Sequence, residues 1–219
     1  MLKAIIFDMD GVLINSTPYI EKAFDFLLKQ NGIIAPNGYW KNKAGLSLKD
    51  TLKIFKEDFG VEFEFQDFAE KVTEIQVKLM KDANEFDEDI KLHTFLKEAK
   101  RENIKLSVAT SSRLVRANEF LRLLKIHTFF DVVIGAEDVE KHKPNPDVFL
   151  KAANRLDIEP KNCVVIEDAL NGIEAAHSGG MKVIGKVTHN FNENDLKIAD
   201  LVINDFSELN VAKLRGLFK

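Results

Sequence analysis

Six short apolar runs, rich in β-branched residues, recur along this chain, and segments with helical periodicity separate most of them. Parallel strands need a crossover connection, usually a helix, and strands that are covered on both faces are apolar along their whole length. The alternation therefore predicts an α/β fold in which helices cover both faces of a parallel sheet. The runs are KAIIF, KLSVA, DVVIG, CVVIE, MKVIG and DLVIN.

The region from about residue 15 to residue 84 breaks this alternation. It contains the helical stretches TPYIEKAFDFLLKQNG, SLKDTLKIFKEDFG and FQDFAEKVTEIQVKLMKDAN, and it has no convincing buried strand. We therefore expect a core domain of residues 1–14 and 84–219 and an all-helical domain of residues 15–83 inserted after the first strand. Two connections between the domains permit hinge motion.

Composition narrows the class of protein. A formal net charge of −4 without a basic block argues against nucleic acid as the main partner. No apolar run is long enough to span a bilayer, and acidic residues interrupt the N-terminal stretch where a signal peptide would continue, so we expect a cytoplasmic protein without a membrane partner. The single cysteine, Cys163, excludes an internal disulfide framework and a cysteine-based zinc site. A monomer is the default expectation.

Polar residues follow the predicted strands at the sheet edge where open α/β folds bind ligands, just beyond the carboxyl ends of the strands. These side chains carry carboxylates, hydroxyls and one ammonium group. They are Asp8 and Asp10 after the first run, Thr110, Ser111 and Ser112 after the second, Lys143 in the loop after the third, and Glu167 and Asp168 after the fourth.

The carboxylates at this edge need a positive partner, because two unit charges ~4 Å apart repel by about 4 kcal/mol at an effective dielectric constant near 20. Oxygen ligands without a neighbouring histidine or cysteine favour a hard divalent ion, Mg²⁺ above all, and Lys143 would add a fixed positive charge. A magnesium ion held by few carboxylates is typically completed by a substrate phosphate. The sequence thus predicts a magnesium site with Asp8, Asp10, Glu167 and Asp168 as candidate ligands. Glu167 would either bind the ion directly or orient a neighbouring ligand.

A magnesium and phosphate site with acidic side chains suggests phosphoryl transfer through an aspartyl-phosphate. We expect Asp8 to be the nucleophile and Asp10 to be the acid that protonates the leaving oxygen and the base that later activates water. The Thr110 hydroxyl, Lys143 and the backbone N–H groups around Met9 and Asp10 would stabilise the phosphoryl oxygens. Ser111 is a candidate substrate contact, and we expect either Ser111 or Ser112 to cap the following helix.

These residues resemble the four motifs of the haloacid dehalogenase superfamily of phosphotransferases. FDMDGVL is similar to the first motif, VATSSR to the second, KHKPNPDVF to the third and VIEDALNGIEAA to the fourth, and they occur in the same order. The resemblance implies a Rossmann-like core with a helical cap after the first motif. It also implies Mg²⁺ bound by Asp8, the Asp10 main-chain carbonyl and Asp168, and mostly phosphatase activity.

The helical cap and the fourth motif are similar to the β-phosphoglucomutase and phosphoglycolate phosphatase-like branch of that superfamily. The mutase carries a histidine and an arginine in the cap where this chain has Ile20 and Leu48, and both departures weaken the mutase interpretation. A small phosphorylated metabolite, a sugar phosphate or a phosphoglycolate-like acid, is the expected substrate of a magnesium-dependent phosphatase. A sugar-phosphate mutase and a non-enzymatic phosphoacceptor module are the alternatives.

The cap loop AGLSLKD is where relatives read the leaving group of the substrate. Gly45 and Lys49 are therefore candidate substrate-binding residues in this loop. The lysines of this region favour anionic substrates if they face the site, although such lysines are most often solvated. Tyr39 and Trp40 could face the substrate from the cap, but we expect them to pack between cap helices.

Overall fold

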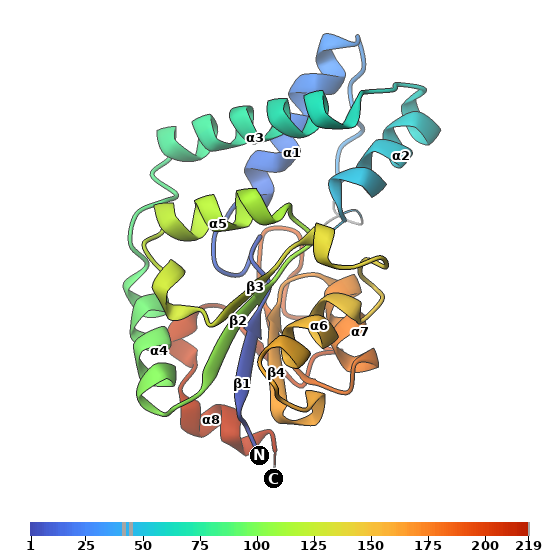
Figure 1. Ribbon diagram of the computed structural model, residues 1–219. Coiled ribbons are helices and arrows are strands. Elements are labelled where there is room, and N and C mark those ends of the chain that lie inside the picture. The colour runs from blue at the N-terminus through green and yellow to red at the C-terminus, as the bar shows by residue number, and fades with distance from the viewer. Residues whose placement is uncertain (41–42, 44–45, 219) are drawn as a thin grey trace.

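The computed structural model describes residues 1–40, 43 and 46–218. A six-stranded sheet with the order β3-β2-β1-β4-β5-β6 forms its centre, and every neighbouring pair is parallel (Figure 1). All six predicted strands are present: β1 (Ala4–Phe7), β2 (Lys105–Ala109), β3 (Val132–Ile134), β4 (Cys163–Glu167), β5 (Lys182–Lys186) and β6 (Leu201–Ile203). The predicted α/β fold is confirmed.

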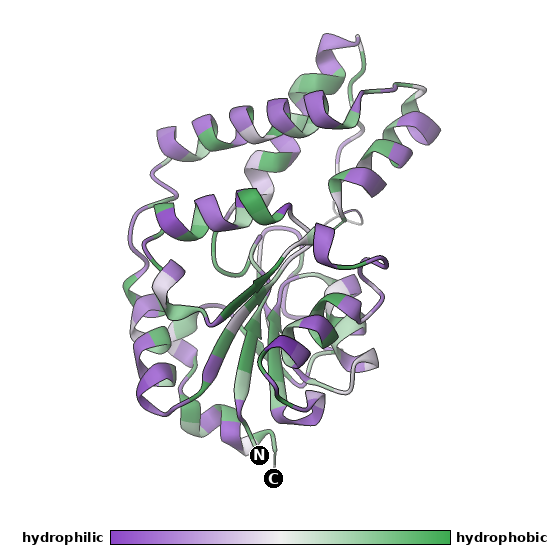
Figure 2. Ribbon diagram, in the orientation of Figure 1, coloured by the Kyte–Doolittle hydropathy of each residue, from purple (hydrophilic) through white to green (hydrophobic). Residues whose placement is uncertain are grey.

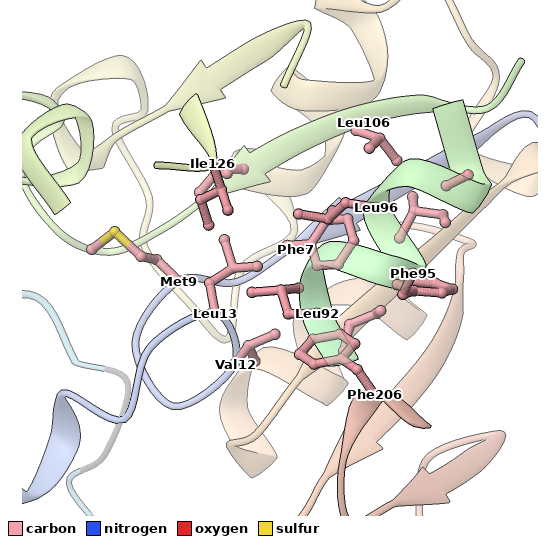
Figure 3. Close-up of a cluster of buried hydrophobic side chains, with 14 of the residues drawn as sticks. Phe7, Met9, Val12, Leu13, Leu92, Phe95, Leu96, Leu106, Ile126 and Phe206 are labelled. Carbon is pink, nitrogen blue, oxygen red and sulfur yellow. The ribbon is translucent and has the colours of Figure 1, made fainter. Parts of the chain in front are cut away.

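Side chains of β1 alternate between two apolar layers, because successive residues of a strand point to opposite faces. Phe7 and Ile5 join a cluster with the helices on one face, part of which is shown in Figure 3. Ala4 and Ile6 join a second cluster on the other face. Helices α4 (Ile90–Arg101), α5 (Leu114–Leu123) and α8 (Val211–Gly216) contribute to the first cluster, and α6 (Asp147–Arg155) and α7 (Leu170–Ser178) to the second. Both faces of the sheet are thus covered.

Three helices between β1 and α4 form a separate layer over the carboxyl ends of the strands (Figure 1). They are α1 (Thr17–Gln30), α2 (Leu48–Phe59) and α3 (Phe65–Asp82), and each lies where a helical stretch was predicted. They have their own apolar cluster, in which Phe24, Phe55 and Phe68 pack ring against ring. The helical insertion is therefore confirmed, and we call α1, α2 and α3 the cap helices.

The two connections between the sheet and the cap helices lie side by side. Asn15, just before α1, donates from its side-chain amide to Glu85, just after α3, at 3.1 Å. The Tyr19 hydroxyl donates to the same Glu85 oxygen at 2.7 Å. The two connections between the core and the cap helices thus meet at one place.

Hydropathy follows the layers: the strands are apolar and the outer helix faces are polar (Figure 2). Across the residues with an assigned structure, no helix combines the length and the hydropathy that crossing a membrane requires.

Asp131 supports the edge of the sheet opposite to the cap helices. Its carboxylate accepts from the buried Leu106 backbone N–H at 2.9 Å and pairs with Lys100 and Lys105 at 3.0 and 3.2 Å. These contacts outweigh the partial burial of the group and lower the pKa of Asp131. Removing the carboxylate leaves a buried donor without its acceptor, which typically costs about 1–3 kcal/mol.

We therefore expect Asp131→Ala to lower the free energy of unfolding by about 1–3 kcal/mol at neutral pH, measured by urea titration. Because the pKa of Asp131 is depressed in the folded state, this difference is fully present above the ordinary aspartate pKa and shrinks as the pH falls through the lower folded value. Glu57→Ala, an exposed carboxylate on α2, serves as the control and should change the stability little. A difference between Asp131→Ala and the parent that is the same at acidic and neutral pH would contradict the assignment.

Candidate active site

Lys143 lies between two carboxylates at the carboxyl edge of the sheet. Its Nζ donates to Asp8 Oδ1 and to Glu167 Oε1, both at 2.6 Å. All three side chains are at least nine-tenths buried. The other oxygen of Glu167 accepts from the Ala169 backbone N–H at 2.7 Å, so this carboxylate is held from two sides.

The electrostatics of this group reflect its burial. Burial raises the pKa of Asp8 to about 7, with the charges of Glu167 and Asp10 acting in the same direction and Lys143 opposing them. Burial works to lower the pKa of Lys143, but Asp8 and Glu167 outweigh it and keep the pKa of the ammonium group above its usual value. Lys143 is therefore a fixed positive charge next to Asp8.

Asp168 lies behind the turn that follows β1. Burial, together with the charges of Glu167 and Asp8, raises the pKa of Asp168 well above its usual value. Gly11 has a φ of +84°, and a Cβ at this position would lie 2.0 Å from Asp168 Oδ2. Only glycine allows this approach of the turn to the Asp168 carboxylate.

The residues after β2 face the same place. Thr110 is almost fully buried, and its hydroxyl oxygen accepts from the Ser112 N–H at 3.0 Å. Thr110, Ser111 and Ser112 line one cavity with Asp8 and Asp10. Met9 is fully buried in the core and does not line this cavity, so its side chain is not the predicted substrate contact.

The expectation that Ser111 or Ser112 caps α5 is wrong. The helix begins at Leu114, with Arg113 at the N-cap and no side-chain cap. Glu137 accepts from the Leu114 N–H at 2.9 Å, so the first helical N–H group already has a partner. The Ser112 hydroxyl instead donates to Asp10 at 2.7 Å.

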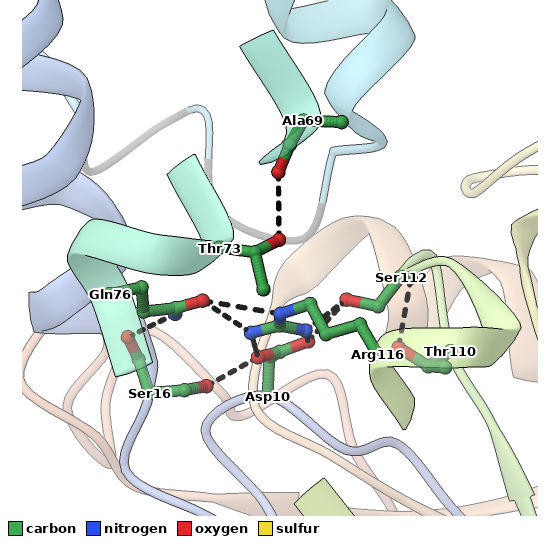
Figure 4. A network of polar contacts seen from close by, with 8 residues as sticks. All are labelled: Asp10, Ser16, Ala69, Thr73, Gln76, Thr110, Ser112 and Arg116. Atoms are coloured by element: carbon green, nitrogen blue, oxygen red, sulfur yellow. Dashed lines mark hydrogen bonds and ion pairs between the residues drawn. The ribbon is translucent and has the colours of Figure 1, made fainter. Parts of the chain in front are cut away.

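Asp10 is the most heavily hydrogen-bonded carboxylate of the site (Figure 4). Arg116 binds it with two nitrogens, at 2.7 Å to Oδ1 and 2.9 Å to Oδ2, and the hydroxyls of Ser16 and Ser112 donate one bond to each oxygen. Burial works to raise the pKa of Asp10, but Arg116 and the two hydroxyls outweigh it and lower the pKa to about 2. Asp10 is therefore held as an anion in this arrangement.

The four carboxylates predicted as metal ligands are used in different ways. Glu167 contacts Lys143 and the Ala169 N–H, and the Asp10 side chain contacts Arg116. Throughout the stretches 1–40, 43 and 46–218, no group of three or more histidine, cysteine, aspartate and glutamate side chains is arranged to hold a metal ion. The side chains of Asp8 and Asp168 remain as candidates, and two buried carboxylates with raised pKa values are a donor set that suits a hard divalent ion.

The cap helices close the cavity from the other side. The cavity has a volume of about 70 Å³, enough for a few water molecules. Ile20 and Leu48 are part of its wall. Other cap residues in the wall are Thr17, Glu21, Phe24, Trp40, Lys43, Leu46 and Thr51.

The two predicted cap contacts have different outcomes. Lys49 lines a neighbouring groove between α2 and the core, with its Nζ 5.6 Å from the centre of the Phe65 ring. It does not line the Asp8 cavity. Gly45 lies outside the residues that the structure describes.

Four residues of the site were missed from the sequence. Ser16, Arg116 and Gln76 complete the network around Asp10, and Lys186 donates to the Gly11 carbonyl at 3.0 Å. Arg116 occurs among apolar residues of α5, with its guanidinium 4.2 Å from the Phe120 ring. A charged residue on an otherwise apolar helix face was the one available signal.

Comparison with known proteins agrees with this geometry. Residues 5–186 match the model of the haloacid dehalogenase-like hydrolase family. The chain is 31% identical to a phosphorylated carbohydrates phosphatase of Thermotoga maritima, over 88% of each chain. It is 32% identical to a β-phosphoglucomutase of Bacillus subtilis, over 97% of this chain and 94% of the relative.

Solved structures show the same fold. The crystal structure of a β-phosphoglucomutase from Clostridium difficile is similar over 100% of this chain and 97% of its own, with a TM-score of 0.87 and 28% identity.

Proposed function

Since the chain belongs to the haloacid dehalogenase-like hydrolase family, we propose that it is a magnesium-dependent phosphatase that hydrolyses a small phosphorylated metabolite through an aspartyl-phosphate on Asp8. The observation that carries the proposal is the buried contact of Lys143 with Asp8 and Glu167, both at 2.6 Å. An ammonium group fixed beside a buried carboxylate suits a site that receives a phosphoryl group.

Each residue of the site would have its own role in the reaction. An Asp8 oxygen attacks phosphorus, and the bond from phosphorus to the leaving oxygen breaks. Asp10 gives a proton to that oxygen and later takes one from the water that hydrolyses the aspartyl-phosphate. Lys143 and the Thr110 hydroxyl stabilise the phosphoryl oxygens, together with backbone N–H groups around Met9. For this role Asp10 has to release some of these hydrogen bonds and take up a proton before the leaving oxygen departs, because both of its oxygens accept hydrogen bonds and its lowered pKa keeps it an anion in this arrangement.

Magnesium fits the donor set of this site. Asp8 and Asp168, with the Asp10 main-chain carbonyl, would hold the ion, and Glu167 would orient Lys143 without binding it. The ion supplies positive charge to the phosphoryl oxygens when bound. The cap helices, which we place in a domain of residues 15–83, would exclude bulk water during the reaction.

The relatives and the residues of the cavity wall support the proposed substrate class. A phosphorylated carbohydrate is the named substrate class of the Thermotoga relative, and a sugar phosphate or phosphoglycolate-like acid is our expectation for this chain. Ile20 and Leu48 in the cavity wall offer no hydrogen bonds to a reorienting sugar, which favours hydrolysis over the mutase reaction. Family membership sets aside the non-enzymatic phosphoacceptor module.

The test is phosphate release from a panel of phosphorylated sugars and short acids, with isomerisation measured in parallel. We expect release to be lost on addition of EDTA and restored by excess Mg²⁺, because the carboxylates of the site need the ion to accept a phosphate dianion. Borohydride reduces an aspartyl-phosphate to homoserine and releases the phosphate, so mass spectrometry of tryptic peptides should find homoserine in place of Asp8. Full activity in EDTA, or isomerisation faster than phosphate release, would contradict the proposal.

A further inference from the structure

Arg116 connects the core to the cap helices at a single guanidinium group (Figure 4). It comes from α5, and two of its nitrogens donate to the two oxygens of Asp10. Nε and one terminal nitrogen also donate to Gln76 Oε1 on α3, at 3.1 and 2.9 Å. The Gln76 amide in turn donates to the Ser16 carbonyl at 3.0 Å, at the start of the cap.

Arg116 is no direct substrate contact. Only 5% of its side chain is exposed, and it does not line the cavity that contains Asp8. Asp10 does line that cavity. Any effect of Arg116 on the reaction therefore has to pass through a neighbour.

We propose that Arg116 is the positioning residue of Asp10, and that it makes the position of this carboxylate depend on the cap through Gln76. This inference rests on the proposed function, since Asp10 matters only if it serves the reaction. Two contacts carry it, one on the core side of the guanidinium and one on the cap side.

The first half is the contact with Asp10. A bidentate guanidinium fixes both the position and the plane of a carboxylate, which a single donor does not. The hydroxyls of Ser16 and Ser112 can rotate away and leave an oxygen of Asp10 to the leaving group or to water. The fork of Arg116 can hold the carboxylate in place during that exchange.

The second half is the contact with the cap. Gln76 is fully buried, and its Oε1 receives two of the bonds that orient the guanidinium. A shift of α3 away from the core removes these bonds, and Arg116 then has only the core to orient it. Asp10 is thus held in place when the cap is closed and is loosened when the cap opens.

Steady-state kinetics with an alkyl phosphate substrate are the first test. A misplacement of a catalytic group by about 1 Å can cost roughly 10²-fold. We expect Arg116→Met to lower kcat by about 10²-fold, with KM changed by less than about threefold since Arg116 does not touch the substrate. Arg116→Lys should recover part of the loss. Arg122→Met, an exposed arginine on the same helix, is the matched control and should leave kcat unchanged.

A second readout separates positioning from a general structural defect. With dinitrophenyl phosphate the leaving group needs no proton, so the burst of dinitrophenolate does not require Asp10 as an acid. We expect Arg116→Met to change the burst rate by less than about threefold while the phosphoenzyme accumulates, because its hydrolysis still needs Asp10 as a base. In an Asp10→Asn background, Arg116→Met should cause no further loss.

Gln76→Leu tests the cap half alone, because it leaves the bond between Arg116 and Asp10 in place. We expect a loss of about tenfold in kcat that does not add to the loss in Arg116→Met. The inference is overturned if kcat of Arg116→Met is unchanged or higher, if the loss persists in the Asp10→Asn background, or if the two losses add. If Arg116→Met does not fold, Arg116→Lys and Gln76→Leu decide the question by the same criteria. Failure of the proposed function itself is distinguishable, because the parent protein would then form no phosphoenzyme.

Discussion

Asp8→Asn is expected to abolish phosphate release, with a loss of at least about 10⁴-fold in kcat. The amide has nearly the shape of the carboxylate but cannot form the acyl-phosphate. Asp8 accepts a 2.6 Å bond from Lys143, and the amide oxygen of the variant can accept the same bond. The variant should therefore fold and melt close to the parent while losing its activity.

The measurement is phosphate release with Mg²⁺ together with trapping of the phosphoenzyme. Asp82→Asn, at the exposed end of α3, is the control and should behave like the parent. Asp10→Asn should also slow turnover but should retain phosphoenzyme formation with an activated substrate. A variant Asp8→Asn that hydrolyses phosphate esters like the parent would remove the basis of the mechanism.

Lys143→Met should damage both activity and stability. Removing one donor that stabilises a transition-state charge typically costs about 10²–10³-fold in kcat. The side chains of Lys143 and Glu167 are each 1% exposed, so the variant leaves two buried carboxylates without their ammonium partner. Breaking a buried ion pair in this way typically costs about 3–5 kcal/mol of the free energy of unfolding.

Urea titration and phosphate release on the same preparation measure the two effects. Lys141→Met, two residues earlier and exposed, is the matched control for a lost lysine in this loop. If Lys143→Met proved as stable and as active as Lys141→Met, Lys143 would be neither a structural nor a phosphate-binding charge.

Most of the architecture could be predicted from the sequence, because it depends on local patterns. The strands are apolar over their full length, and Asp8, Thr110 and Asp168 follow directly after β1, β2 and β4. Since parallel strands end at one edge, strand order was not needed to bring these residues together. The three cap helices were readable from their periodicity.

The contacts among the polar side chains could not be predicted from local sequence patterns. Which carboxylate faces Lys143, and which faces a metal, depends on side-chain direction over distances of a few ångströms. Glu167 and Asp168 are neighbours in sequence, yet Glu167 turns toward Lys143 and Asp168 toward Gly11. Arg116 and Gln76 are 40 residues apart, and only the docking of α3 on the core brings them together. The serines after Thr110 illustrate the same limit, since the helix they were expected to cap starts later.

Trp40 gives the protein a built-in optical reporter. It is the sole tryptophan of the sequence, and it forms part of the cavity wall. Its indole N–H donates to Asp25 at 2.9 Å, and its ring packs 5.2 Å from Phe24, both on α1. Intrinsic fluorescence thus originates from one indole at the boundary between the cap helices and the substrate space. Stopped-flow emission can follow ligand entry in the unlabelled protein.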